Sequence, residues 1–138
     1  MPTPTPKKIL LVDDDRFLLD MYAIKFNKSG YEVKTADSTD AGLQLMRGGY
    51  VPDIVLCDVV MPGMDGLEMV SIAQKEKLMP NATIIMLTNQ GSSDDIARAR
   101  KLNVDGYIVK ATTVPSEVLK EVENVLLSKK PAPLTNPI

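Results

Sequence analysis

The stretch that decides the fold is ILLVDDD, residues 9–15, in which four apolar residues run directly into three aspartates. Three further stretches have the same form, a short apolar run closed by one polar residue. They are IVLCD at 54–58, TIIMLT at 83–88 and YIVK at 107–110. Short, bounded runs rich in β-branched residues are typical of strands that are buried on both faces of a parallel sheet.

The polar residues that close these runs predict a common site. Ligands of open parallel sheets bind at the carboxyl ends of the strands, near the point where the strand order reverses. Carboxylates gathered at that edge repel one another unless a cation lies among them, and hard oxygen ligands suit Mg²⁺. The sequence therefore predicts a magnesium ion beside these closing residues: Asp13, Asp14, Asp15, Asp58, Thr88 and Lys110.

Helical patterns alternate with the strands. After the first strand, apolar residues recur at helical spacing and predict a helix that ends at Lys28-Ser29-Gly30: Phe17, Leu18, Met21 and Ile24. Residues 31–36 alternate between polar and apolar, which favours a strand at the edge of the sheet. Further helices are expected from Asp37–Asp40 to the stop at Gly48-Gly49, after the breaker-rich loop 61–66, and from Pro115 onward, with one more after Thr88 and a polar loop. Five β-α units of this kind predict a doubly wound α/β domain with a five-stranded parallel sheet.

Composition limits the classes of function. The 138 residues suit one domain, which we expect at 7–130 between disordered proline-rich tails at 1–6 and 131–138. A net charge of −2, six aromatic residues (four tyrosines, two phenylalanines) and no tryptophan argue against direct nucleic-acid binding. With no histidine, Ser-His-Asp and Cys-His catalysis are excluded. No apolar run is long enough for a membrane span, and the single Cys57, expected in the core, suits a reducing cytoplasm.

Each candidate residue also has a purely structural interpretation. Asp58 could cap the following loop, and the aspartates at 13–15 could serve the first turn of a helix, where negative charge is favoured. Three acids exceed what capping needs, so we interpret Asp14 as a direct metal ligand, Asp13 as a water-mediated one and Asp15 as the cap. Thr88 alone could begin a helix, and Tyr107 alone would be an ordinary edge aromatic.

Taken together, the motifs resemble the receiver domain of bacterial response regulators. The resemblance covers about residues 7–130 and rests on four segments: LVDD at 11–14, LCDVVMPGMDG at 56–66, LT at 87–88 and YIVK at 107–110. It implies a flavodoxin-like sheet with strand order 2-1-3-4-5, an order for which a member of this family serves as a standard example.

The resemblance also implies a function. Asp58 would accept a phosphoryl group from a phosphohistidine on a sensor kinase or phosphotransfer protein, with Mg²⁺ bound by Asp13, Asp14, Asp58 and the backbone carbonyl of Val60. Thr88 and Lys110 would contact the phosphoryl group. Movement of Thr88 would let Tyr107 turn inward and reshape the surface of the fourth helix, fifth strand and fifth helix, which would bind a downstream protein or a second copy in a homodimer.

Two residues depart from the family pattern. Ala111 stands where the family usually has a proline in a cis peptide, and since a cis bond before alanine costs about 3–4 kcal/mol, we expect a trans bond there. Val60 stands two residues after the acceptor, where many relatives carry a polar group, and it offers nothing to align an attacking water.

Two other functions fit part of the pattern. A haloacid-dehalogenase-like phosphatase would use Asp13 and Asp15 with a later threonine and lysine, but it would not need Asp58. A receiver-like binding module that is never phosphorylated would accept no phosphoryl group at all.

Overall fold

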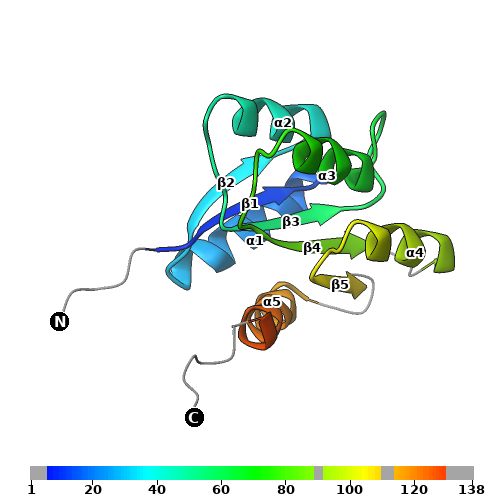
Figure 1. Ribbon diagram of the computed structural model, residues 1–138. Coiled ribbons are helices and arrows are strands. Elements are labelled where there is room, and N and C mark those ends of the chain that lie inside the picture. Colours follow the sequence, from blue (N-terminus) through cyan, green and yellow to red (C-terminus); the bar gives the residue numbers. More distant parts are fainter. Residues whose placement is uncertain (1–5, 89–91, 110–113, 130–138) are drawn as a thin grey trace, which may run out of the picture.

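The structure is a computed structural model and describes residues 6–88, 92–109 and 114–129 (Figure 1). One parallel sheet contains five strands in the order β2-β1-β3-β4-β5. The strands are β1 (Lys8–Val12), β2 (Glu32–Ala36), β3 (Ile54–Asp58), β4 (Thr83–Thr88) and β5 (Gly106–Val109). The predicted fold class and strand order are confirmed, and the order reverses between β1 and β3, where a ligand site is expected.

Five helices connect the strands. They are α1 (Arg16–Lys28), α2 (Thr39–Arg47), α3 (Gly66–Lys75), α4 (Ser93–Lys101) and α5 (Pro115–Lys129). The first four begin after an aspartate or serine whose side chain accepts a hydrogen bond from the backbone N–H three residues later: Asp15, Ser38, Asp65 and Ser92. Such caps satisfy amide groups that lack a partner within the helix. α5 begins instead with Pro115, whose ring fixes a helical φ.

Burial along the strands explains their sequence patterns. Every residue of β3 and β4 is buried, and so are the last four of β1, because helices cover both faces of the sheet there. Edge strand β2 is mostly exposed, as its alternating sequence predicts. The apolar runs therefore form the central strands of the sheet, and the polar residues that follow them lie at the carboxyl ends of these strands.

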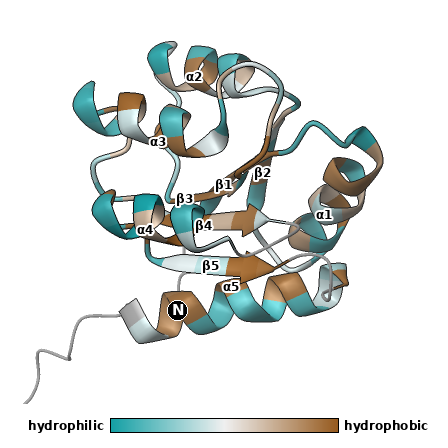
Figure 2. Cartoon of the chain, turned by 90° about the vertical axis from the view of Figure 1, so that its right-hand side faces the viewer, coloured by the Kyte–Doolittle hydropathy of each residue, from teal (hydrophilic) through white to brown (hydrophobic). Residues whose placement is uncertain are grey.

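The core has two layers, one on each side of the sheet. Buried side chains of α2, α3 and α4 pack on one face, and those of α1 and α5 pack on the other. Figure 2 shows the hydrophobic strands β1 and β3 between these helices. Six of the eight methionines belong to the α2–α3–α4 layer: Met46, Met61, Met64, Met69, Met79 and Met86. Among the described residues, the buried cluster of the α1–α5 layer has no methionine and is built from Ile, Leu, Val, Phe and Tyr.

The apolar residues that predict α1 are not the ones that it buries most deeply. The helix is present, but its buried residues are Leu19, Tyr22 and Phe26, whereas Phe17 and Ile24 are exposed by 72% and 58%. Apolar residues occur on both faces of this helix, so periodicity alone does not select one. Phe26 decides the packing, because it is fully buried and its ring meets the ring of Tyr31 edge-on at 5.4 Å.

Some predictions fall on residues outside the described ranges. Lys110, the bond between Lys110 and Ala111, and the tails apart from Pro6 all lie there. Among the described residues, none of the helices is both long and apolar enough to span a bilayer.

Candidate functional site

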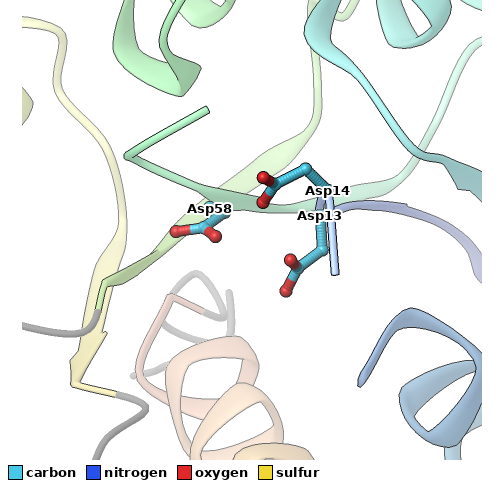
Figure 3. A group of neighbouring side chains, drawn as sticks. All are labelled: Asp13, Asp14 and Asp58. Atoms are coloured by element: carbon cyan, nitrogen blue, oxygen red, sulfur yellow. The ribbon is translucent and has the colours of Figure 1, made fainter. Parts of the chain in front are cut away.

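Three carboxylates meet where β1 and β3 end. Asp13 and Asp14 follow β1, and Asp58 is the last residue of β3, the neighbouring strand. One carboxylate oxygen from each lies within 4.8 Å of the other two (Figure 3). We call these three residues the acid cluster. Its donors are the hard oxygen ligands that Mg²⁺ prefers, and their crowding is unfavourable without a cation, so the cluster fits such an ion.

The three acids differ in exposure. Asp13 and Asp58 are buried, with 1% and 4% of their surface accessible, whereas Asp14 is exposed. Asp13 also accepts a hydrogen bond from the backbone N–H of Asp15 at 2.9 Å. Asp15 has a different role, because its side chain accepts a hydrogen bond from the N–H of Leu18 and caps α1. Its predicted capping role is confirmed, and a carboxylate used in this way is poorly placed to act as a phosphatase acid.

Residues 59–65, which we call the acceptor loop, connect Asp58 to α3. The loop is held tightly at both ends, since the N–H of Val59 donates to Leu87 at 2.8 Å and the N–H of Gly66 donates back to Val59 at 2.8 Å. At Gly66 a Cβ would lie 2.0 Å from the carbonyl oxygen of Asp58. Only glycine therefore lets the first turn of α3 approach Asp58 this closely.

The acceptor loop is also joined to two helices. The hydroxyl of Thr39, a buried residue of α2, donates to the carbonyl of Met64 at 2.8 Å. On the other side, Arg98 of α4 donates to both carboxylate oxygens of Asp65 at 3.1 and 2.9 Å. Sequence reasoning missed both contacts, because the partners lie 25 and 33 residues apart and neither pairing leaves a local pattern.

Thr88 and Tyr107 lie on neighbouring strands beside the acid cluster. Thr88 ends β4 and is buried, and its strand pairs with β3 so that Leu87 stands opposite Asp58. The Tyr107 hydroxyl is buried too, and it forms no hydrogen bond of standard geometry with any described residue. Burial raises the pKa of Tyr107, and the nearby Thr88 side chain opposes part of that shift. Tyr107 is partly buried and packs against the α2–α3–α4 layer, and its inward movement with Thr88 stays a prediction.

Three further residues were singled out from the sequence: Val60, Cys57 and Lys110. Val60 is 67% exposed, so an apolar side chain faces solvent two residues after Asp58. Cys57 is fully buried in the core as predicted, and burial raises the pKa of its thiol. Lys110 lies outside the described residues, so its position relative to the acid cluster stays a prediction.

Comparison with known proteins gives one family. The sequence model of the family "Response regulator receiver domain" matches residues 9–123. The chain is 34% identical over 122 residues to chemotaxis protein CheY of Halobacterium salinarum, covering 87% of this chain and 97% of that protein. It is 30% identical over 132 residues to the phosphate regulon transcriptional regulatory protein PhoB of Pseudomonas aeruginosa, covering 96% of this chain. Against such transcriptional regulators it spans only part of their length, 57% for PhoB and 23% for GlrR of Escherichia coli.

Solved structures agree with the sequence relatives. A CheY-like receiver domain protein of Methanospirillum hungatei superimposes with a TM-score of 0.80 at 29% identity, covering 89% of this chain and 95% of that one. The chemotaxis response regulator CheY4 of Vibrio cholerae gives a TM-score of 0.79 at 29% identity, covering 88% and 99%. The likeness therefore extends over nearly all of the described fold.

Proposed function

This chain belongs to the response regulator receiver domain family, and on that premise we propose that it accepts a phosphoryl group on Asp58. The donor is a phosphohistidine on a sensor kinase or a phosphotransfer protein. Receiver domains are signalling proteins rather than conventional enzymes, so the outcome is a change in which partner the chain binds. The acid cluster is the observation that supports the proposal, because one of its members is a nearly buried carboxylate at a strand end beside two acids whose oxygens could hold a metal ion.

The transfer is a single displacement at phosphorus. A carboxylate oxygen of Asp58 attacks, a P–O bond forms, and the P–N bond breaks with its electron pair returning to the imidazole of the donor. Mg²⁺ held by the acid cluster and the Val60 carbonyl would neutralise charge on the phosphoryl oxygens. Thr88 would donate its hydroxyl to one of those oxygens, and Lys110 would contribute a positive charge.

The exposed stripe of α1 suits the approach of the donor. Phe17, Met21 and Ile24 are spaced four and three residues apart, so they share one face of the helix, and all three are exposed. The stripe begins two residues after Asp15, next to the acid cluster. A phosphohistidine carried on a helical domain would bury this stripe as its imidazole reaches Asp58, a helix-against-helix contact of ordinary type.

Output runs through a second surface. As Thr88 is drawn to the phosphoryl group, Tyr107 would turn inward, and the surface of α4, β5 and α5 would change and bind a downstream protein or a second copy of the chain. The family usually works in the cytoplasm, and we assign the chain to that compartment.

Intact mass after incubation with acetyl phosphate tests the proposal. We expect one phosphoryl adduct that requires Mg²⁺ and is lost in Asp58→Asn. Asp20→Asn is the matched control, because Asp20 is an exposed aspartate of α1 outside the acid cluster, and it should label like the wild type.

Other outcomes point to other functions. No adduct, under conditions that label a known receiver, would indicate a binding module that is never phosphorylated. Hydrolysis of a generic phosphate ester that survives Asp58→Asn but not Asp13→Asn would indicate a haloacid-dehalogenase-like phosphatase.

A further inference from the structure

An ion pair joins α4 to the residue that begins α3. Arg98 lies in the last turn of α4, and one of its terminal nitrogens contacts both oxygens of Asp65, with a second nitrogen 3.4 Å from Asp95 of its own helix. A charge-assisted contact of this kind is stronger than a neutral hydrogen bond, and here one nitrogen is shared between the two carboxylate oxygens. The pair therefore defines where α4 stands relative to Asp65.

Asp65 is in turn fixed to the acceptor loop. Its side chain accepts from the N–H of Glu68 at 2.8 Å while the side chain of Glu68 accepts from the N–H of Asp65 at 3.2 Å. This reciprocal capping box makes Asp65 rigid with the first turn of α3. Gly66, the next residue, meets the carbonyl of Asp58 with no space for a side chain. A displacement of the acceptor residue is thus passed through Gly66 to Asp65 and Arg98.

On the side of α2, the acceptor loop is fixed in place. Thr39 is buried and its hydroxyl is bonded to the carbonyl of Met64, so α2 holds the loop at a fixed point. Arg98, by contrast, is a half-exposed side chain on a helix that contributes one buried residue, Ala99, to the core. Of the two helices attached to the acceptor loop, α4 is the one that can follow its movement.

We propose that Arg98 is a positioning residue that couples α4 to the acid cluster through Asp65 and the acceptor loop. This route starts from the acceptor loop and not from Thr88, although Arg98 also lies close enough to Tyr107 to affect its pKa. The inference rests on the proposed function, since it takes the acid cluster as a metal and phosphoryl site. It adds a second connection between that site and the helix expected to bind partners.

Mg²⁺ without a phosphoryl donor separates the two routes. The metal would bind the acid cluster and the Val60 carbonyl, which belongs to the acceptor loop, whereas the proposed contact of Thr88 is with the phosphoryl group and not with the metal. Movement of α4 on addition of Mg²⁺ alone therefore reports the Arg98 route. By linkage, two sites that share one coupled element respond to each other.

The experiment is a titration of the ¹⁵N-labelled full chain with Mg²⁺, followed by amide chemical shifts. The variants are Arg98→Gln, Asp65→Asn and the double variant, with Arg100→Gln as a control on an exposed arginine of the same helix. Asp65→Asn removes the charge but keeps a side-chain oxygen that caps α3. We expect the shifts of residues 93–101 to fall by at least about half in either single variant and no further in the double variant, the signature of two residues acting as one unit.

Shifts at Asp14 and Val59 report metal binding itself and should persist in every variant. If they move while α4 responds equally in wild type and Arg98→Gln, the coupling is refuted and the proposed function is untouched. Additive losses in the double variant also refute it. If Asp14 and Val59 do not move at all in the wild type, the metal site of the proposed function fails, and the coupling fails with it.

Discussion

Gly66 has no side chain because none would fit between α3 and the acceptor residue. We expect Gly66→Ala to displace the carbonyl of Asp58 and to lower the free energy of unfolding by about 1–3 kcal/mol, as overpacking of a tight site does. The same displacement separates Asp58 from Asp13 and Asp14, so phosphorylation by acetyl phosphate should slow as well. Urea denaturation and intact mass measure the two effects.

Gly48→Ala is the control for this prediction. Gly48 ends α2 with a φ of −78°, and a Cβ there would stay 3.3 Å or more from any neighbour. If Gly66→Ala is as stable and as readily labelled as Gly48→Ala, the tight approach of α3 to Asp58 matters neither for stability nor for phosphorylation.

We expect Val60 to affect a different property of the same site, the lifetime of the phosphorylated state. The exposed apolar side chain of Val60 cannot orient a water molecule toward the acyl phosphate, whereas the side-chain amide of an asparagine could. We expect Val60→Asn to shorten the phosphoaspartate half-life while changing stability by no more than about 0.5 kcal/mol, as is usual for an exposed position. The decay of the phosphoryl adduct after donor removal measures this, and an unchanged half-life would contradict it.

Among the elements, α1 presents two phenylalanines in opposite environments. Phe26 is fully buried, so Phe26→Ala should destabilise the fold by about 3–5 kcal/mol. Phe17 is 72% exposed, so Phe17→Ala should leave stability nearly unchanged but slow transfer from a phosphohistidine donor. Labelling by acetyl phosphate, which needs no docking surface, should be unaffected. Equal rates from both donors would show that the stripe has no part in docking.

Strands and caps could be read from the sequence because their signals are local. A run such as IVLCD is bounded on both sides, and Asp15 lies just before a helix, so neither depends on distant residues. The buried face of α1 could not be read, because both faces carry apolar residues and only contact with the sheet and Tyr31 selects one. The packing of Tyr107 against the α2–α3–α4 layer and the pairing of Arg98 with Asp65 are likewise tertiary contacts without a local pattern.

The acid cluster affects the stability of the whole molecule. Three neighbouring carboxylates repel one another in the metal-free protein, and a bound Mg²⁺ would relieve that repulsion. At a Mg²⁺ concentration one hundred times its dissociation constant, the free energy of unfolding should rise by about 2.7 kcal/mol, and the melting temperature should rise with it. Asp14→Asn should be more stable than wild type in EDTA, because one charge is gone, and it should gain less from Mg²⁺. Thermal unfolding with and without Mg²⁺ measures both, and Asp20→Asn again serves as the control. Equal gains in Asp14→Asn and wild type would argue against Asp14 as a ligand.

The uneven placement of methionine gives the molecule a built-in reporter. Methionine is unbranched and adapts to irregular space, so the layer beneath α2, α3 and α4 can repack at lower cost than the branched side chains beneath α1 and α5. Methyl-labelled methionine would therefore yield a spectrum in which almost every core signal comes from the side that holds Tyr107 and α4. A single isotope label would follow the half of the protein expected to move, while the described part of the other half would contribute only the exposed Met21 of α1.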